Sequence, residues 1–113
     1  ALGYLHANCG TCHNPRSVEF RSVDLELWLP AAALESVEAT PAYRTAAGVR
    51  RQRLGAGSVL PDLRIAAGEP EQSALYQRMA TRDPNVQMPP LGTTLVDVKG
   101  LEVVGEWIRG LAR

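Results

Sequence analysis

The stretch Asn8–Pro15 reads N-C-G-T-C-H-N-P and holds the only two cysteines of the chain, Cys9 and Cys12. Two residues separate them, and His13 follows at once. Four interpretations compete: a disulfide, a zinc site, a redox-active dithiol and covalent attachment of haem. A disulfide across two intervening residues closes a very small loop, so it would add little stability.

Zinc binding and dithiol chemistry both need surroundings that the sequence does not offer. A structural zinc ion normally takes four Cys or His ligands, and all the Cys and His residues of this chain crowd into residues 6–13. One short helix can hardly place these four side chains around a single zinc ion in tetrahedral geometry. A redox C-x-x-C motif normally lies near a βαβ pattern. The residues before Cys9 do not read as a strand, and no later segment supplies the missing sheet.

The spacing C-x-x-C-H is that of c-type haem attachment. The two thiols add across the two vinyl groups of one haem, and the adjacent histidine is aimed at the iron from the same backbone turn. Cysteine is uncommon, so the motif rarely arises by chance in so short a chain. We therefore predict one covalently bound haem c, with Cys9 and Cys12 as thioether anchors and His13 as the proximal iron ligand.

Length and composition fit one domain built around such a group. The chain has 113 residues, of which 45% are hydrophobic and 5% aromatic, with 8 Pro and 10 Gly. We expect a single domain over residues 1–113 with one modest core. Long unsupported loops are expected too, and a large flat cofactor would supply the apolar mass that they lack.

Charge and hydropathy argue against binding to nucleic acid or a membrane surface and against a membrane-spanning segment. The formal net charge is zero, which does not favour nucleic acid or a membrane surface. No apolar run approaches the roughly 20 residues that span a bilayer. Because Ala1 lies almost directly before the Cys motif, we expect the chain to be a mature product or an excised domain.

The second axial ligand of the iron would decide its chemistry, and the candidates are His6, Met79 and Met88. His6 lies on the same short helix as His13 and cannot reach the opposite haem face, so we interpret it as a surface residue. Met79 shares a predicted helix face with Leu75, and we interpret it as a core residue. Met88 lies in N-V-Q-M-P-P-L-G-T-T, where the prolines reduce the entropy of holding its sulfur in place. We therefore predict Met88 as the ligand. The alternative is a purely structural role, in which Met88 is a buried methionine that fills a gap in the packing.

Ligation by His and Met raises the reduction potential. It also leaves no open iron position for a substrate. The ligand set therefore favours electron transfer over oxygen activation, and we predict that the chain is not an enzyme in its own right.

Outside the middle of the chain, three helices are expected. The first covers residues 1–13. The second begins at Pro70, which suits a first helical position, with Glu69 and Gln72 as a weak capping box, and it ends before Asp83-Pro84. The last covers residues 96–113, with Asp97 as the N-cap.

An apolar stripe at helical spacing marks the inner face of the last helix: Leu101, Val104, Ile108 and Leu111. Gly105 costs about 1 kcal/mol against Ala inside a helix. It would be tolerated if another helix crossed closely there, with Gly3 as a candidate on the opposing helix.

The middle of the chain, residues 17–69, is less informative. The segment P-A-A-A-L-E-S-V-E-A predicts one short helix. A basic residue of this region is expected to pair with the haem propionates, and Arg64 is the first choice because it precedes the helix that leads to Met88. The bases that cluster with it are Arg44, Arg50, Arg51 and Arg53. Trp28 and Tyr43 are candidates to pack on the macrocycle or to donate to a propionate.

The segments C-G-T-C-H, Q-M-P-P-L-G and L-E-V-V-G-E-W-I-R-G-L together resemble a class I mono-haem c-type cytochrome. The run G-E-P-E-Q-S-A-L-Y-Q-R-M, followed by Q-M-P-P-L-G and V-V-G-E-W-I, is similar to cytochrome c domains appended to larger bacterial periplasmic oxidoreductases. The resemblance covers residues 1–15 and 64–113. It implies an all-α cytochrome c-like fold in which the first and last helices cross around one haem, with a long irregular middle segment.

The resemblance also implies a function. Iron held by His13 and Met88 would cycle between ferric and ferrous states, and electrons would pass between redox proteins such as a dehydrogenase, an oxidase or another cytochrome. Haem attachment in this family takes place outside the cytoplasm, so a periplasmic or otherwise exported protein is expected. Two alternatives stay open: a haem enzyme or sensor, peroxidase-like, in which Met88 is displaceable, and an electron-relay domain of a larger fused dehydrogenase.

Overall fold

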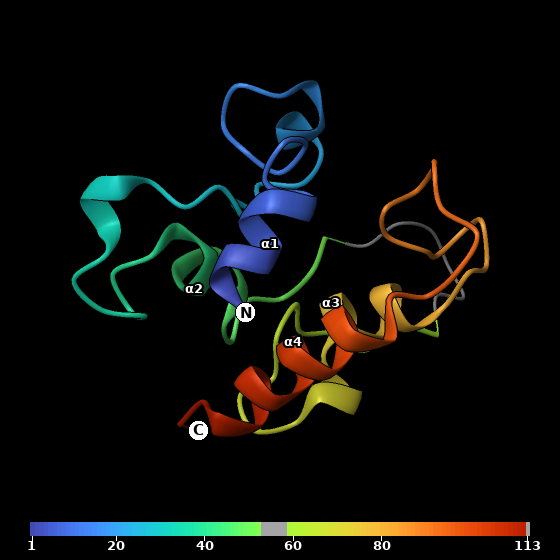
Figure 1. The fold of residues 1–113 in the computed structure, drawn as a ribbon. Coiled ribbons are helices and arrows are strands. Elements are labelled where there is room, and N and C mark those ends of the chain that lie inside the picture. The colour runs from blue at the N-terminus through green and yellow to red at the C-terminus, as the bar shows by residue number, and fades with distance from the viewer. Residues whose placement is uncertain (53–58, 113) are drawn as a thin grey trace. The chain divides into compact units, whose positions relative to one another are not determined.

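The computed structural model describes residues 1–52 and 59–112, and within them the regular secondary structure is helical, joined by long irregular segments (Figure 1). These residues form four α-helices, three short 3-10 helices and no strand; Arg50 and Leu63 form an isolated antiparallel bridge. The prediction of an all-α chain is confirmed. The structure divides into two units, residues 1–47 and residues 48–113, and each is described by itself.

Unit 1 holds two α-helices linked by a long irregular segment. α1 spans Leu2–Cys9, so the predicted first helix forms but ends four residues before His13, and α2 spans Pro41–Ala46. Between them lie the 3-10 helices η1, Val18–Arg21, and η2, Ala31–Ala33. The buried apolar residues of this unit are Leu5, Leu25, Leu27, Ala42 and Ala46.

The helix predicted for P-A-A-A-L-E-S-V-E-A is wrong beyond its first turn, because only η2 forms there. The Ser36 hydroxyl accepts a hydrogen bond from Ala39 N (3.1 Å), and such local side-chain bonds compete with a helix. The regular helix begins later, at Pro41. Thr40 caps it by accepting from Tyr43 N (3.3 Å). The sequence T-P-A, with a cap residue before a proline, could have indicated this start.

Unit 2 begins with two extended segments and ends with two packed helices. Gly48 N donates to Ile65 O (2.9 Å) and Arg51 N to Asp62 O (2.8 Å), which pairs the two segments. The 3-10 helix η3 (Pro70–Gln72), α3 (Ala74–Ala80) and α4 (Val98–Gly110) pack on one another. Their apolar side chains include the buried Met79, Val104 and Ile108.

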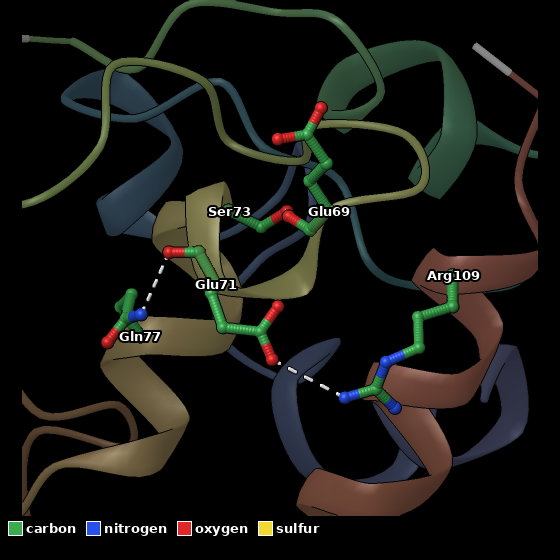
Figure 2. Close-up of polar contacts among 5 residues, drawn as sticks. All are labelled: Glu69, Glu71, Ser73, Gln77 and Arg109. Carbon is green, nitrogen blue, oxygen red and sulfur yellow. Dashed lines mark hydrogen bonds and ion pairs between the residues drawn. The ribbon is translucent and has the colours of Figure 1, made fainter.

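The second helix is broken at Ser73, where one continuous helix was predicted. Ser73 has extended backbone angles, and the hydroxyl of this fully buried residue donates to Glu69 O (2.9 Å) and accepts from Ala66 N (2.9 Å). These bonds replace helical ones, and the Glu69–Gln72 capping box does not form. Figure 2 shows the result: Glu71 of η3 lies between Gln77 of α3 and Arg109 of α4, and it bonds to both.

α4 forms where it was predicted but ends at Gly110, so Leu111 of the predicted stripe lies just beyond the helix. Asp97 caps it by accepting from Gly100 N (3.0 Å), and Val104 and Ile108 of the predicted stripe are fully buried. A Cβ at Gly105 would lie 2.9 Å from Cε2 of Tyr76. Within this unit, the missing side chain of Gly105 therefore leaves room for the ring of Tyr76 of α3. The predicted neighbour, Gly3, lies in unit 1. No helix in the described ranges is long and apolar enough to cross a membrane.

Candidate functional site

The C-x-x-C-H motif forms one tight turn at the end of α1. Cys9 is the last helical residue, and its carbonyl accepts from both Cys12 N (3.2 Å) and His13 N (2.9 Å). Cys12 is exposed, Cys9 is half-buried, and both thiols are free. The structure thus brings the three motif residues together on one turn of backbone, and neither thiol is in a disulfide.

Gly10 is the position of the motif where a side chain has no room. A Cβ there would lie 2.7 Å from the carbonyl oxygen of His6 and 3.0 Å from Cα of Trp28. A Cβ atom 2.7 Å from a backbone oxygen would force the backbone to shift. The turn that carries the cysteines is therefore held directly against the segment around Trp28.

Bonds on both sides hold the backbone of His13. Its N–H is bonded to Cys9 O, and its carbonyl accepts from Leu27 N (2.8 Å). The following turn is also closed: the Asn14 side chain donates to Gly10 O and to Thr11 O (both 2.8 Å), and the Ser17 hydroxyl donates to Cys12 O. The imidazole of His13, which is half-buried, thus projects from a fixed backbone.

The two thiols are in different environments. Burial, followed by the charge of Cys12, raises the pKa of Cys9 to about 11. The thiol of Cys9 is therefore almost fully protonated at neutral pH. A raised pKa does not fit an active-site dithiol, whose nucleophilic cysteine has a lowered pKa.

His6 is half-buried, not exposed. Its Nδ1 accepts a hydrogen bond from Leu29 N (2.8 Å), and its ring lies 4.3 Å from that of Trp28, centroid to centroid. The interpretation of His6 as a surface residue is therefore wrong, because its ring links α1 to the segment Trp28–Leu29. Trp28 itself remains 46% exposed.

Met88 lies in unit 2, on a loop that follows α3. Its N–H donates to Arg78 O (3.0 Å) and its carbonyl accepts from the Arg82 guanidinium (3.1 Å). Gln87, which is 7% exposed, donates to Pro89 O (3.0 Å) and to Thr93 O (3.4 Å). The loop is non-helical, as predicted, and Met88 is half-buried on it. Met79 is 9% exposed, so its interpretation as a core residue is confirmed.

Arg64 is buried, with 5% of its surface exposed. Its N–H donates to Val49 O (2.8 Å) and its carbonyl accepts from Leu75 N (3.0 Å), so its position in unit 2 is fixed. Its role at a propionate stays a prediction, as do those of Trp28 and Tyr43. Arg53, another predicted base, lies outside the described residues.

Sequence reasoning missed three residues that surround Met88: Arg78, Arg82 and Gln87. Arg78 donates to Val86 O (2.9 Å), and burial and the charge of Arg51 lower its pKa. Polar residues near a proline-rich loop give no pattern of their own. Only the short distance along the chain between Arg82 and the M-P-P triplet could have drawn attention to them.

His13 of unit 1 carries an imidazole and Met88 of unit 2 a thioether, and both kinds of group are known as ligands of haem iron. In residues 1–52 and 59–112 no group of three or more His, Cys, Asp or Glu side chains could hold a metal ion. Comparisons of the chain with known protein families, with curated proteins and with solved structures give no match.

Proposed function

We propose that this chain is an electron carrier with one covalently bound haem c. The observation that carries the proposal is the turn at residues 9–13, in which one carbonyl, that of Cys9, organises both Cys12 and His13. Two free thiols and an imidazole on one turn suit the vinyl groups and the iron of a single haem.

Each residue would have a separate task. The thiols of Cys9 and Cys12 would each add sulfur and hydrogen across one vinyl double bond, so that no atom is lost. His13 would offer an imidazole nitrogen from a backbone tied to Cys9 and Leu27. Met88 would offer its thioether from unit 2, and Arg64 would pair with a propionate. A bound haem supplies one-electron cycling between ferric and ferrous iron.

The proposed biological setting follows from the resemblance to class I cytochromes. We propose an exported or periplasmic location, since haem attachment of this kind takes place outside the cytoplasm, and redox proteins as partners. The cytochrome c-like arrangement, with first and last helices crossing around the haem, belongs to the same proposal.

The first test is to express the chain in a bacterial host that attaches haem c and to measure its mass and visible spectrum. We expect the mass of one haem, retained under denaturing conditions, and loss of covalent attachment in the double variant Cys9→Ala/Cys12→Ala. A wild-type chain that leaves such a host without haem would overturn the proposal.

The second test concerns the iron ligand. The oxidised protein should show the weak band at the red end of the spectrum that a bond between Met sulfur and ferric iron produces. Met88→Ala should abolish this band and Met79→Ala should keep it. The reverse pattern would assign the ligand to Met79. Fast peroxide turnover, or tight carbon monoxide binding by the wild type, would favour an enzyme or a sensor over a carrier.

A further inference from the structure

Arg82 lies between α3 and Met88 in the chain, and its side chain binds backbone carbonyls both before and after it in the sequence. Its Nε donates to Thr81 O (2.6 Å), and its Nη2 donates to both Met79 O (3.2 Å) and Met88 O (3.1 Å). Its Nη1 donates to the Thr93 hydroxyl (3.2 Å). One guanidinium thus joins the end of α3, Met88 and the far side of the loop.

The acceptors explain why an arginine suits this position. Three of the four are backbone carbonyls, and those of Met79 and Thr81 lie at the C-terminal end of α3, where the helix dipole favours a positive charge. The planar guanidinium directs several donors at fixed angles. A lysine has a single charged nitrogen on a flexible stem and cannot hold all of these acceptors in the same way.

The backbone of Met88 is held on both sides. Its N–H is bonded to Arg78 O and its carbonyl to Arg82. Thr93 is the fourth acceptor of Arg82, and its hydroxyl in turn donates to Leu95 O (3.0 Å), which extends the hydrogen-bond network to the end of the loop. Because the peptide groups on either side of Met88 are fixed, the direction of its Cα–Cβ bond is fixed as well.

We infer that Arg82 is a positioning residue that aims the thioether of Met88 at the haem iron, an inference that rests on the proposed function. Arg82 touches neither the sulfur nor the haem in this role. It acts through the Met88 carbonyl and keeps the loop in the one conformation that presents the sulfur. Weakening this contact lowers the fraction of molecules in which sulfur is bound to iron.

The test compares Arg82→Gln and Arg82→Lys with Arg109→Gln in the haem-loaded protein. Arg109 is the control, because it is another arginine of unit 2, although an exposed one, and it bonds to Glu71 instead of the loop. Imidazole, which competes with Met88 for ferric iron, is the probe. We expect it to bind about tenfold more tightly to both Arg82 variants, because its apparent affinity rises as the competing Met-bound fraction falls. Arg109→Gln should match the wild type.

A stability control separates positioning from general loosening of the fold. Val104→Ala removes apolar volume from the fully buried core of unit 2, at a position on α4 outside the loop. If Val104→Ala increases imidazole affinity as much as Arg82→Gln does, the effect is general and the inference is overturned. Wild-type imidazole affinity in both Arg82 variants overturns it as well.

A measurement without haem keeps this inference separate from the proposed function. In the haem-free chain, hydrogen exchange of the Met88 amide should be faster in Arg82→Gln than in the wild type or Arg109→Gln. Unchanged exchange means that Arg82 does not hold the loop, whatever the chain binds. If exchange is faster but the chain never attaches haem, the contact between Arg82 and Met88 is supported. The proposed function is then overturned, and with it the role of Arg82 toward iron.

Discussion

Among single residues, Cys9 and Cys12 belong to one motif but have different surroundings. Cys9 ends α1 and is half-buried, whereas Cys12 is exposed on the following turn. Burial and the nearby Cys12 raise the pKa of Cys9 from its ordinary value of 9.0 to about 11. Since the thiolate is the reactive form, the fold protects Cys9 from alkylation.

This difference predicts the behaviour of the haem-free chain toward iodoacetamide at pH 8. Unfolding in urea should speed alkylation of Cys9 by about a hundredfold, because two pH units separate the folded and unfolded pKa values. Peptide mass spectrometry gives the rate at each cysteine, and Cys12→Ser tests the second cause by removing the neighbouring thiol. Equal rates for Cys9 in the folded and unfolded chains would contradict the prediction.

The same pKa fixes the direction of a pH effect on stability. Between about pH 9 and pH 11 the folded chain keeps the Cys9 proton and the unfolded chain loses it. The free energy of unfolding of the haem-free chain should therefore fall as the pH rises through this window.

At the scale of elements, the contact between α3 and α4 depends on a glycine. A Cβ on Gly105 would lie 2.9 Å from the Tyr76 ring, so α4 accepts a residue with poor helix propensity in order to pack against an aromatic side chain. Gly110, at the end of the same helix, has nothing within 4 Å of its Cβ position. The two glycines therefore form a matched pair.

We expect Gly105→Ala to destabilise the chain by about 1–2 kcal/mol, because overpacking against Tyr76 outweighs the gain in helix propensity. Gly110→Ala should be neutral or stabilising by less than about 1 kcal/mol. In a Tyr76→Leu background, Gly105→Ala should cost less, and a double-mutant cycle in urea measures the coupling. Additive effects would mean that Tyr76 is not the residue that requires the glycine.

At the scale of the whole molecule, the proposed iron ligands come from different units. His13 belongs to unit 1 and Met88 to unit 2. If both ligands bound one iron, the bond would form only in the folded state. It would therefore raise the free energy of unfolding of both units. Each unit has one tryptophan, Trp28 in unit 1 and Trp107 in unit 2.

These tryptophans allow the link to be measured in haem-loaded protein. In the single-tryptophan variants Trp28→Phe and Trp107→Phe, thermal unfolding is followed by the fluorescence of the remaining tryptophan. Adding Met88→Ala should lower both midpoints, by roughly 4–8 °C for each kcal/mol lost. Met79→Leu, a change of similar volume in the core of unit 2, should affect mainly the Trp107 signal. A fall in the Trp107 midpoint alone after Met88→Ala would contradict the link.

The elements that local sequence predicted well are those with local causes. The first helix, the Asp97 cap and the apolar stripe of α4 depend on residues within a few positions of one another. The chemistry proposed for Cys9, Cys12 and His13 likewise depends on adjacent residues whose spacing is visible in the chain. Met88 was singled out because prolines stiffen the loop around it.

Tertiary structure decided whatever depends on residues distant in sequence or on competing hydrogen bonds. The Ser73 hydroxyl broke a helix because Ala66 and Glu69 offered it better partners. Tyr76 met Gly105 only because α3 and α4 pack together, and Arg82 reached Met88 and Thr93 only once the loop had folded back. Sequence by itself thus determined the motif and the places of α1 and α4, because spacing and propensity are local; the contacts that hold them in place arise only when the chain folds.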